Sequence, residues 1–165
     1  MSLTVNANLR LVAIQTLEGP FVTPTDATFT IDQLKLLDQF TGSTSVPVTK
    51  TSAYELTMSS GTGSVNLASL PGSTSEETIV GTGLKVQFLI LCNKSTNANK
   101  IAITKGASNG YGLAASGDSW TLVLSPGQMA FLYLNEAAPD VASGARLWDV
   151  TGTGSQVLQI VVILG

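Results

Sequence analysis

Residues 120–134, which read WTLVLSPGQMAFLYL, decide the fold class of this 165-residue chain. Two short apolar runs, residues 120–124 and 129–134, flank the tetrapeptide Ser125-Pro126-Gly127-Gln128. Proline in the second position and glycine in the third are typical of a tight turn, because proline presets φ and glycine tolerates positive φ. The stretch therefore predicts two strands joined by a turn.

The same pattern of strand and turn extends over residues 44–165. Gly, Pro and Asn clusters separate the apolar runs, and no gap between runs is long enough for a crossover helix, which argues against a parallel α/β fold. The most apolar run, residues 84–92, is expected to be a central strand. We predict an all-β fold, a jelly-roll-like antiparallel β-sandwich. The eight expected strands are residues 46–58, 65–68, 84–92, 101–103, 120–124, 129–134, 146–150 and 157–164.

The first 43 residues have a different pattern and are predicted to form an N-terminal arm. Polar and apolar residues alternate over residues 3–13, which indicates a strand longer than a compact sheet needs, so we expect a bend or a detached arm. Residues 32–40, DQLKLLDQF, carry apolar residues at helical spacing, with Thr30 as N-cap and Gly42 as stop. They predict either one short helix or an irregular strand. The expected domains are residues 1–43, the arm, and residues 44–165, the β-sandwich.

Composition excludes several classes of function. The chain has no histidine, so Ser-His-Asp and Cys-His nucleophiles and histidine-ligated metal sites are impossible. Eight basic residues against eleven acidic ones provide no basic face for nucleic acid. The longest apolar runs fall far below the roughly 20 residues of a membrane helix, and no signal peptide is visible, so a soluble protein without a membrane partner is expected.

Three further motifs are expected to be structural. Cys92, the single cysteine, lies in an apolar run and is predicted to be a buried, inert thiol. The stretches SSGTGSV, VGTGL and TGTGSQ do not open onto a helix, as phosphate binding requires, and indicate hairpin turns. The loop carboxylates are interpreted as solvated charges rather than a glycosidase pair or a calcium site, since no ladder of oxygen ligands exists. They are Asp118, Glu136, Asp140 and Asp149.

Aromatic residues are the remaining candidates for a ligand or interface site. Trp120 and Trp148 lie between apolar neighbours, which favours a place in the core or in a subunit interface. Tyr111, in the loop SNGYG, is the residue to test for a ligand. No catalytic residue, cofactor or metal ligand is predicted.

Residues 65–165 resemble small β-rich structural proteins from the virions of tailed bacteriophages. The motifs that carry the resemblance are NLASLPG, GTGLKVQFLILCN, TNANKIAITKGASNGYGL, LSPGQMAFLYLNEAAPD and DVTGTGSQVLQIVVILG. The resemblance implies a non-enzymatic viral protein of the capsid decoration or cement type, made in the host cytoplasm and located on the exterior of the capsid. Its partners would be the major capsid protein and further copies of itself, often as trimers. A carbohydrate-binding tail-fibre or lectin-like module is the alternative.

Self-association is also expected from composition. A mean hydropathy of +0.31 with 12% charged residues leaves apolar surface uncovered on a monomer of this size. The first and last strands could leave sheet edges that need pairing or cover. A homo-oligomer meets both needs, and the arm could clasp a neighbour; a trimer is favoured only by the resemblance.

Overall fold

The computed structural model describes residues 4–7, 12–19, 22–30, 38–41, 47–72, 77–114, 118–134 and 138–165. Within these ranges the chain forms strands and turns and no helix, and every strand pair is antiparallel. The prediction of an all-β, antiparallel fold is therefore confirmed. No helix in the described ranges is long and apolar enough to cross a membrane.

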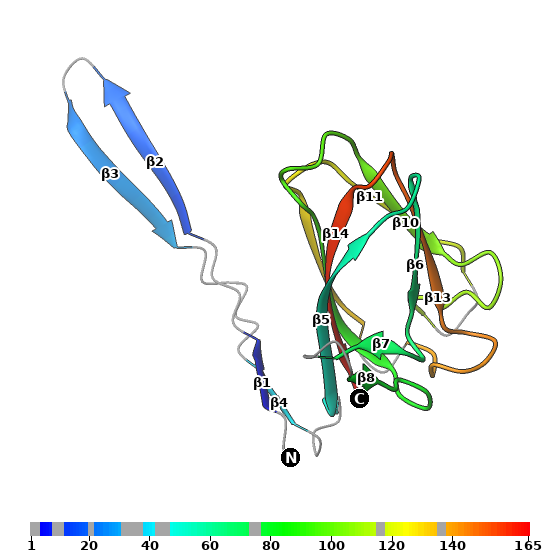
Figure 1. The fold of residues 1–165 in the computed structure, drawn as a ribbon. Helices are drawn as coiled ribbons and strands as arrows, with labels where there is room; N and C mark the ends of the chain where they lie inside the picture. Colours follow the sequence, from blue (N-terminus) through cyan, green and yellow to red (C-terminus); the bar gives the residue numbers. More distant parts are fainter. Residues whose placement is uncertain are drawn as a thin grey trace.

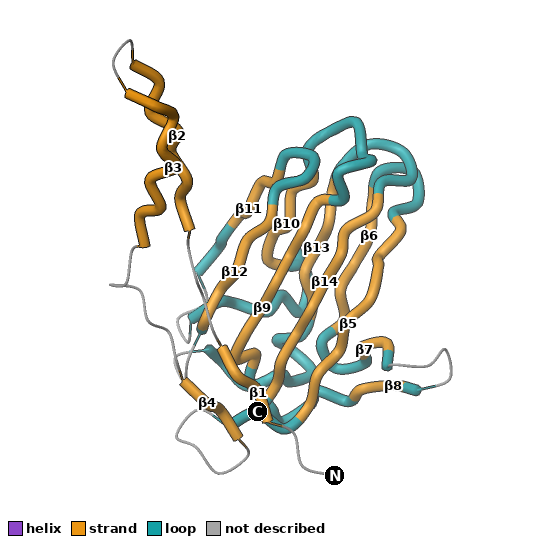
Figure 2. Tube along the Cα trace, turned by 90° about the vertical axis from the view of Figure 1, so that its left-hand side faces the viewer, coloured by secondary structure: helices purple, strands orange, loops and turns teal. Residues whose placement is uncertain are grey.

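Two four-stranded sheets make up the body of the molecule, in the orders β12-β9-β14-β5 and β11-β10-β13-β6. Figures 1 and 2 show the two sheets on opposite sides of the body. β9 lies between β12 and β14, so the most apolar run of the sequence is a central strand, as predicted. The strands are β5 (Lys50–Thr57), β6 (Thr62–Asn66), β9 (Val86–Asn93), β10 (Ile101–Lys105), β11 (Thr121–Leu124), β12 (Met129–Tyr133), β13 (Leu147–Thr151) and β14 (Val157–Leu164).

The order of pairing is nested along the chain. Among these eight strands the first pairs with the last (β5 with β14), the second with the seventh (β6 with β13), the third with the sixth (β9 with β12) and the fourth with the fifth (β10 with β11). Consequently the turns after β5, β9, β11 and β13 each lead from one sheet to the other.

The prediction that the glycine-rich stretches are hairpin turns is confirmed for one of them only. Within SSGTGSV, Ser59 and Thr62 pair with each other across Ser60 and Gly61, although β5 and β6 themselves lie in different sheets. TGTGSQ joins β13 to β14, which also lie in different sheets. VGTGL leads from β8 (Thr78–Ile79), which pairs with β7 (Leu70–Pro71), into β9. The sequence cannot distinguish these cases, because a hairpin turn and a turn between sheets both need residues that tolerate positive φ.

One hydrophobic cluster lies between the sheets and takes side chains from both. Along β14, alternate residues from Leu158 to Leu164 are buried, and they meet Ile101 and Ile103 of β10 and Trp148 of β13 in the same cluster. Each fully buried large apolar side chain contributes about 1.5–3 kcal/mol relative to an exposed one. This cluster orients every strand of the body, because each strand presents one face to it and the other to solvent.

Amide side chains hold the loops at one end of the body. Asn93, at the end of β9, is fully buried; its Nδ2 donates to the carbonyl oxygens of Leu124 (2.8 Å) and Asn99 (3.1 Å). Asn97 donates from Nδ2 to Asn93 Oδ1 (2.7 Å) and to Val157 O (2.6 Å). Hydrogen bonds between uncharged groups therefore fix these loops in position, a role that ion pairs have in more highly charged proteins.

The described residues before residue 47 form four strands that join neither large sheet. β1 (Thr4–Ala7) pairs with β4 (Asp38–Thr41), and β2 (Val12–Gly19) pairs with β3 (Val22–Thr30). β1 covers residues 4–7 of the alternating stretch 3–13 and β2 begins at Val12, whereas residues 8–11 lie outside the described residues. Figure 1 shows the β2–β3 hairpin extending away from the body. The expected boundary between residues 43 and 44 lies outside the described residues.

Of the two alternatives predicted for residues 32–40, a short helix or an irregular strand, the helix is wrong at the C-terminal end, where the chain forms a strand. Residues 38–40 belong to β4, where Phe40 pairs with Val5 and Gln39 with Asn6. A helix of eight or nine residues is marginal by itself, whereas pairing with β1 provides the backbone hydrogen-bond partners directly. Residues 32–37 of that prediction lie outside the described residues.

Candidate functional site

The outward surface of the β12-β9-β14-β5 sheet is the candidate site, and we call it the outer face. Its residues alternate with the core residues along each strand, and the register aligns them in three rows across the sheet. The second and third rows are mainly apolar, whereas the first row is apolar on β12 and β9 and polar on β14 and β5. The rows are Met129, Cys92, Gln159 and Glu55; Phe131, Ile90, Val161 and Ala53; and Tyr133, Phe88, Ile163 and Thr51.

An aromatic cluster occupies the β12 side of the outer face. The ring of Phe88 stacks on Tyr133 with centroids 4.9 Å apart and lies 6.1 Å from the ring of Phe131. Phe88 is buried, whereas Met129, Phe131 and Tyr133 are 65%, 47% and 38% exposed. Three large apolar side chains on one five-residue strand are thus presented to solvent. Contiguous apolar surface of this kind marks interaction sites in soluble proteins.

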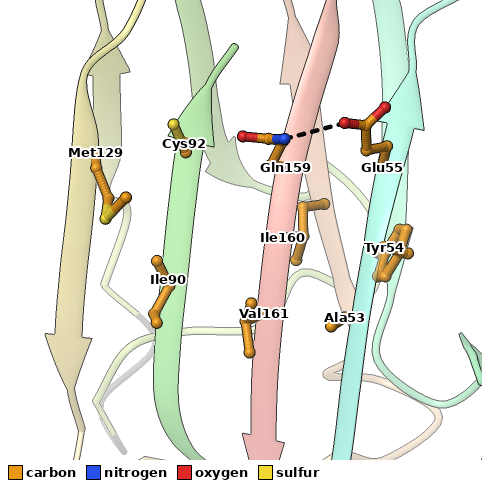
Figure 3. Close-up of a pocket in the computed structure, with 9 residues that line it drawn as sticks. All are labelled: Ala53, Tyr54, Glu55, Ile90, Cys92, Met129, Gln159, Ile160 and Val161. Atoms are coloured by element: carbon orange, nitrogen blue, oxygen red, sulfur yellow. Dashed lines mark hydrogen bonds between the residues drawn. The ribbon is translucent and has the colours of Figure 1, made fainter. Parts of the chain in front are cut away.

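A groove with a volume of about 480 Å³ crosses the middle of the outer face, and Figure 3 shows its lining residues on all four strands. Sulfur-containing and aliphatic side chains dominate the lining. Such side chains offer shape and apolar area but few directional contacts, which suits a protein surface better than a small polar substrate. The lining residues are Ala53, Tyr54, Glu55, Ile90, Cys92, Met129, Gln159, Ile160 and Val161.

One corner of the outer face is polar and internally paired. Lys94 Nζ donates to both oxygens of Glu55 (2.9 and 3.2 Å), and Gln159 Nε2 donates to Glu55 Oε1 (3.0 Å). The hydrogen bond from Lys94, followed by that from Gln159, lowers the pKa of Glu55 below its ordinary value. The carboxylate therefore stays ionised and paired, and it is poorly suited to act as a general acid.

Cys92 lies in the first row of this face, and its position corrects the prediction of a buried thiol. The residue is partly exposed, and its Sγ lies 3.7 Å from the carbonyl oxygen of Asn93. The apolar run LKVQFLILCN suggested burial because both of its alternating faces are apolar. In the fold one of these faces contacts the core and the other forms part of the outer face.

The three aromatic residues singled out from the sequence come together elsewhere, against the other sheet. Trp148 packs edge-on against Trp120 and Tyr111, with both pairs of ring centroids 5.9 Å apart. The indole Nε1 atoms of Trp120 and Trp148 both donate to the carbonyl oxygen of Tyr111 (3.2 and 3.1 Å). Tyr111 and Trp148 are fully buried, so their rings meet solvent only if this end of the sheet opens. Their role in ligand binding or in an interface stays a prediction.

Tyr111 is fixed at its hydroxyl as well. Its Oη donates to the carbonyl oxygen of Pro139 (2.6 Å) and accepts from the backbone N–H of Val86 (3.0 Å). Burial raises the pKa of this hydroxyl to about 12, outweighing the opposite effect of the Val86 N–H. The phenol therefore joins the 138–146 loop to the start of β9.

The loop carboxylates do not form a metal cluster in the described part of the chain. Asp140 lies 3.7 Å from Lys85 Nζ in an exposed ion pair, and Asp149 Oδ2 accepts from the backbone N–H of Ala107 (2.9 Å). Within the described ranges no group of three or more Cys, Asp or Glu side chains could hold a metal ion. Glu136 lies outside the described residues.

Met129 and Phe131 are site residues that the sequence argument missed. A usable signal was present, because MAFLYL is apolar at both alternating sets of positions. A strand with one solvated face alternates apolar with polar residues, so two apolar faces indicate a strand covered on both sides. The core covers one side of β12, and the described residues leave the other exposed.

A scan of protein-family models, a search of curated proteins and a search of solved structures gave no match to this chain. These comparisons therefore assign no family to the chain.

Proposed function

We propose that this chain is a non-enzymatic structural protein of a tailed-bacteriophage virion that binds the exterior of the capsid and stabilises it. Its partners are the major capsid protein and further copies of itself, with a trimer favoured. The carrying observation is the outer face: a regular four-stranded surface whose second and third rows are mainly apolar and whose Glu55 is already paired with Lys94. Such a surface binds another protein by area and shape.

The proposal includes a jelly-roll β-sandwich as the fold of the body. Nested pairing of first with last strand through to fourth with fifth, divided between two four-stranded sheets, supports it. This strand order arises when a long antiparallel hairpin, which contains four strand pairs, is rolled up into two sheets. Jelly rolls of eight strands recur in viral capsid domains.

Adhesion is the proposed mechanism. A capsid presents the same surface many times, so an oligomer that contacts several subunits at once binds far more durably than one face alone. A neutral, apolar face also binds with little dependence on salt, because few charges on it are screened. Decoration would thus persist over a range of ionic conditions.

The side chains of the outer face are poorly suited to acid–base catalysis, which supports a non-enzymatic role. Glu55 is held as a paired carboxylate, and the remaining described groups in the three rows are hydroxyl, amide, thiol and apolar side chains. Catalysis by acid and base needs groups with pKa values matched to proton transfer in a cleft. The outer face offers a shallow protein-binding surface instead.

Reconstitution on capsids tests the proposal directly. Capsids of the phage whose genome encodes this chain are prepared without it, mixed with the purified full-length protein and sedimented. We expect saturable binding in a fixed ratio to the major capsid protein. Met129→Asp should weaken that binding at least tenfold, whereas Val80→Asp, which alters an exposed apolar residue outside the three rows, should not.

Labelling of intact virions separates the proposal from its rival. Gold-labelled antibody against the protein should mark the head surface in electron micrographs. Label confined to tail fibres, together with binding of the full-length protein to a glycan array, would replace decoration with the carbohydrate-binding alternative. Absence of the protein from purified virions would refute both.

A further inference from the structure

We infer that the free edge of β12 is a docking site for the β2–β3 hairpin of a second copy of this chain, with β2 pairing directly with β12. The inference rests on the self-association part of the proposed function and names the surface that performs it. The donor hairpin and the acceptor edge lie on the same chain, so each copy gives one and receives one.

The hydrogen-bond pattern of β12 defines the acceptor. Asn93 N–H donates to Gln128 O (3.0 Å), and Leu134 N–H donates to Gln87 O (2.9 Å). Because an antiparallel ladder alternates, the even-numbered residues of β12 face β9. Met129 and Phe131 therefore direct their backbone N–H and C=O groups away from β9. No described strand pairs with that side of β12.

The side chains of β12 lack the usual protection of an edge strand. Natural edges are shielded by charge, proline or extreme shortness. β12 has neither charge nor proline over its five residues, whereas β5, the opposite edge of the same sheet, carries Lys50 and Glu55. Val123 of β11, the neighbouring edge of the other sheet, is also 51% exposed. The apolar residues at this edge are therefore of the kind found on a surface that another strand or protein covers.

The β2–β3 hairpin can supply the pairing strand that the edge of β12 lacks. β2 and β3 pair only with each other among the described strands, and an isolated two-stranded hairpin is marginally stable in water. β3 contains Pro24, which has no backbone N–H to donate, and Asp26, so it has the composition of an outer edge. β2, VAIQTLEG, has no proline and can accept a further strand. Adding the hairpin would make a six-stranded sheet with β2 inside and β3 outside.

The position of the hairpin indicates that it belongs on another copy. Figures 1 and 2 show the hairpin extending away from its own body. Donor and acceptor are different surfaces, so the contact is head-to-tail and closes as a ring, which accommodates a trimer.

Disulfide trapping between two variants tests the pairing. In a Cys92→Ser background, one tagged chain carries a cysteine in β2, at Ile14, Gln15 or Thr16 in turn. A second, untagged chain carries Phe131→Cys, and the two are co-expressed and mildly oxidised without any capsid present. Paired strands bring Cα atoms within disulfide range, and consecutive positions sample both faces and neighbouring registers. We expect a tagged–untagged disulfide with at least one of the three donor cysteines.

Each other outcome contradicts the inference. As a control, one chain carries both Phe131→Cys and the β2 cysteine, and a disulfide within that single chain would show that the hairpin folds onto its own body. A disulfide between two Phe131→Cys chains without the β2 cysteine would show symmetric β12 pairing instead. An intact oligomer that forms no mixed disulfide with any of the three donors would exclude the contact. Capsid binding is not measured here, so failure of this pairing leaves capsid decoration to its own test.

Light scattering on size exclusion provides a second measurement that needs no crosslink. Phe131→Asp should shift the oligomer towards the 17.1 kDa chain mass at low micromolar concentration. Thr51→Asp places the same charge on the outer face at the opposite edge strand and should leave the mass unchanged. Equal masses for both variants would count against the β12 edge as the contact.

Discussion

Gly61 shows how one residue positions a whole loop. It adopts φ of +81°, and a Cβ there would lie 2.7 Å from the carbonyl oxygen of Gly152. The backbones of the two loops are in fact hydrogen-bonded, because Gly61 N–H donates to Gly154 O (2.7 Å) and Gly152 N–H donates to Gly61 O (2.8 Å). The turn after β5 and the turn after β13 therefore hold each other, and a side chain at residue 61 would separate them.

Gly61→Ala should destabilise the fold by about 1–3 kcal/mol, since a strained φ and a backbone clash act together. Gly144→Ala is the matched control: its Cβ would meet no atom within 4 Å. Urea unfolding of the two variants measures the difference. Equal midpoints would show that the two loops do not rely on their close approach.

Tyr111 should make stability depend on alkaline pH. Its folded pKa, about 12, lies above the ordinary value of 10.0, so the stabilisation is complete below pH 10 and is lost as pH rises towards 12. Tyr54 is partly buried, and that burial raises its pKa too. In Tyr111→Phe the loss of stability between pH 10 and 12 should be smaller than in the unchanged protein, although not abolished.

The same substitution should lower stability at neutral pH by about 1–3 kcal/mol, because the N–H of Val86 loses its acceptor in a buried place. Thermal unfolding followed at pH 7, 10 and 11.5 measures both effects. An identical alkaline decline in both proteins would assign it to other groups.

At the scale of elements, the loop after β9 depends on Asn93 more than on its own residues. The buried amide joins β9, the loop at Asn97 and Asn99, and the end of β11. These contacts connect strands of both sheets at one end of the body. A single uncharged side chain thereby sets how the two sheets are joined there.

Asn93→Ala should cost about 2–4 kcal/mol, since two carbonyl oxygens lose a buried donor and a small cavity forms. Asn66→Ala, which removes an exposed amide with one hydrogen bond to the backbone N–H of Ala68, should cost about 1 kcal/mol or less. Equilibrium unfolding in urea compares the two. A cost at Asn93 no greater than that at Asn66 would contradict its place as the link between sheets.

The pairing of Glu55 on β5 with Lys94 should be visible in acid. The pKa of Glu55 is lowered from its ordinary value of 4.5, so the pair stabilises the fold above that pH and ceases to do so as pH falls through the lowered value. Both groups are exposed, so the effect on stability is small and weakens with salt. NMR titration should find the pKa of Glu55 below 4.5 and should find it raised in Lys94→Met. An unchanged pKa in that variant would show that the pair does not persist in solution.

At the scale of the whole molecule, stability should not depend on metal. The core runs continuously between the two sheets, and no metal-binding cluster lies within the described residues. Adding excess EDTA should leave the melting temperature unchanged. Loss of a ligand present at 100 times its Kd would remove roughly 2.7 kcal/mol. A fall of several degrees would therefore reveal a bound ion.

The amino-acid sequence by itself determined the fold class and most strand positions. Short apolar runs over β9, β10 and β14, with proline and glycine between β11 and β12, are signals that depend on local backbone preference and on the length of a strand. Such signals lie within a few residues of one another. For the same reason the sequence left a helix and a strand open for residues 38–40, because their apolar spacing allowed a helix and only pairing with β1 made them a strand.

Tertiary structure alone decided which sheet each strand joins and which residues form the outer face. Phe131, Phe88 and Ile163 belong to three strands distant in sequence, and only the pairing register brings them onto one surface. Tyr111 looked like a loop residue available to a ligand, yet its ring is buried against Trp148. Local sequence encodes the conformation of each segment, whereas exposure depends on which distant segments cover it. Which segments cover which residues depends on the free energy of packing the whole chain.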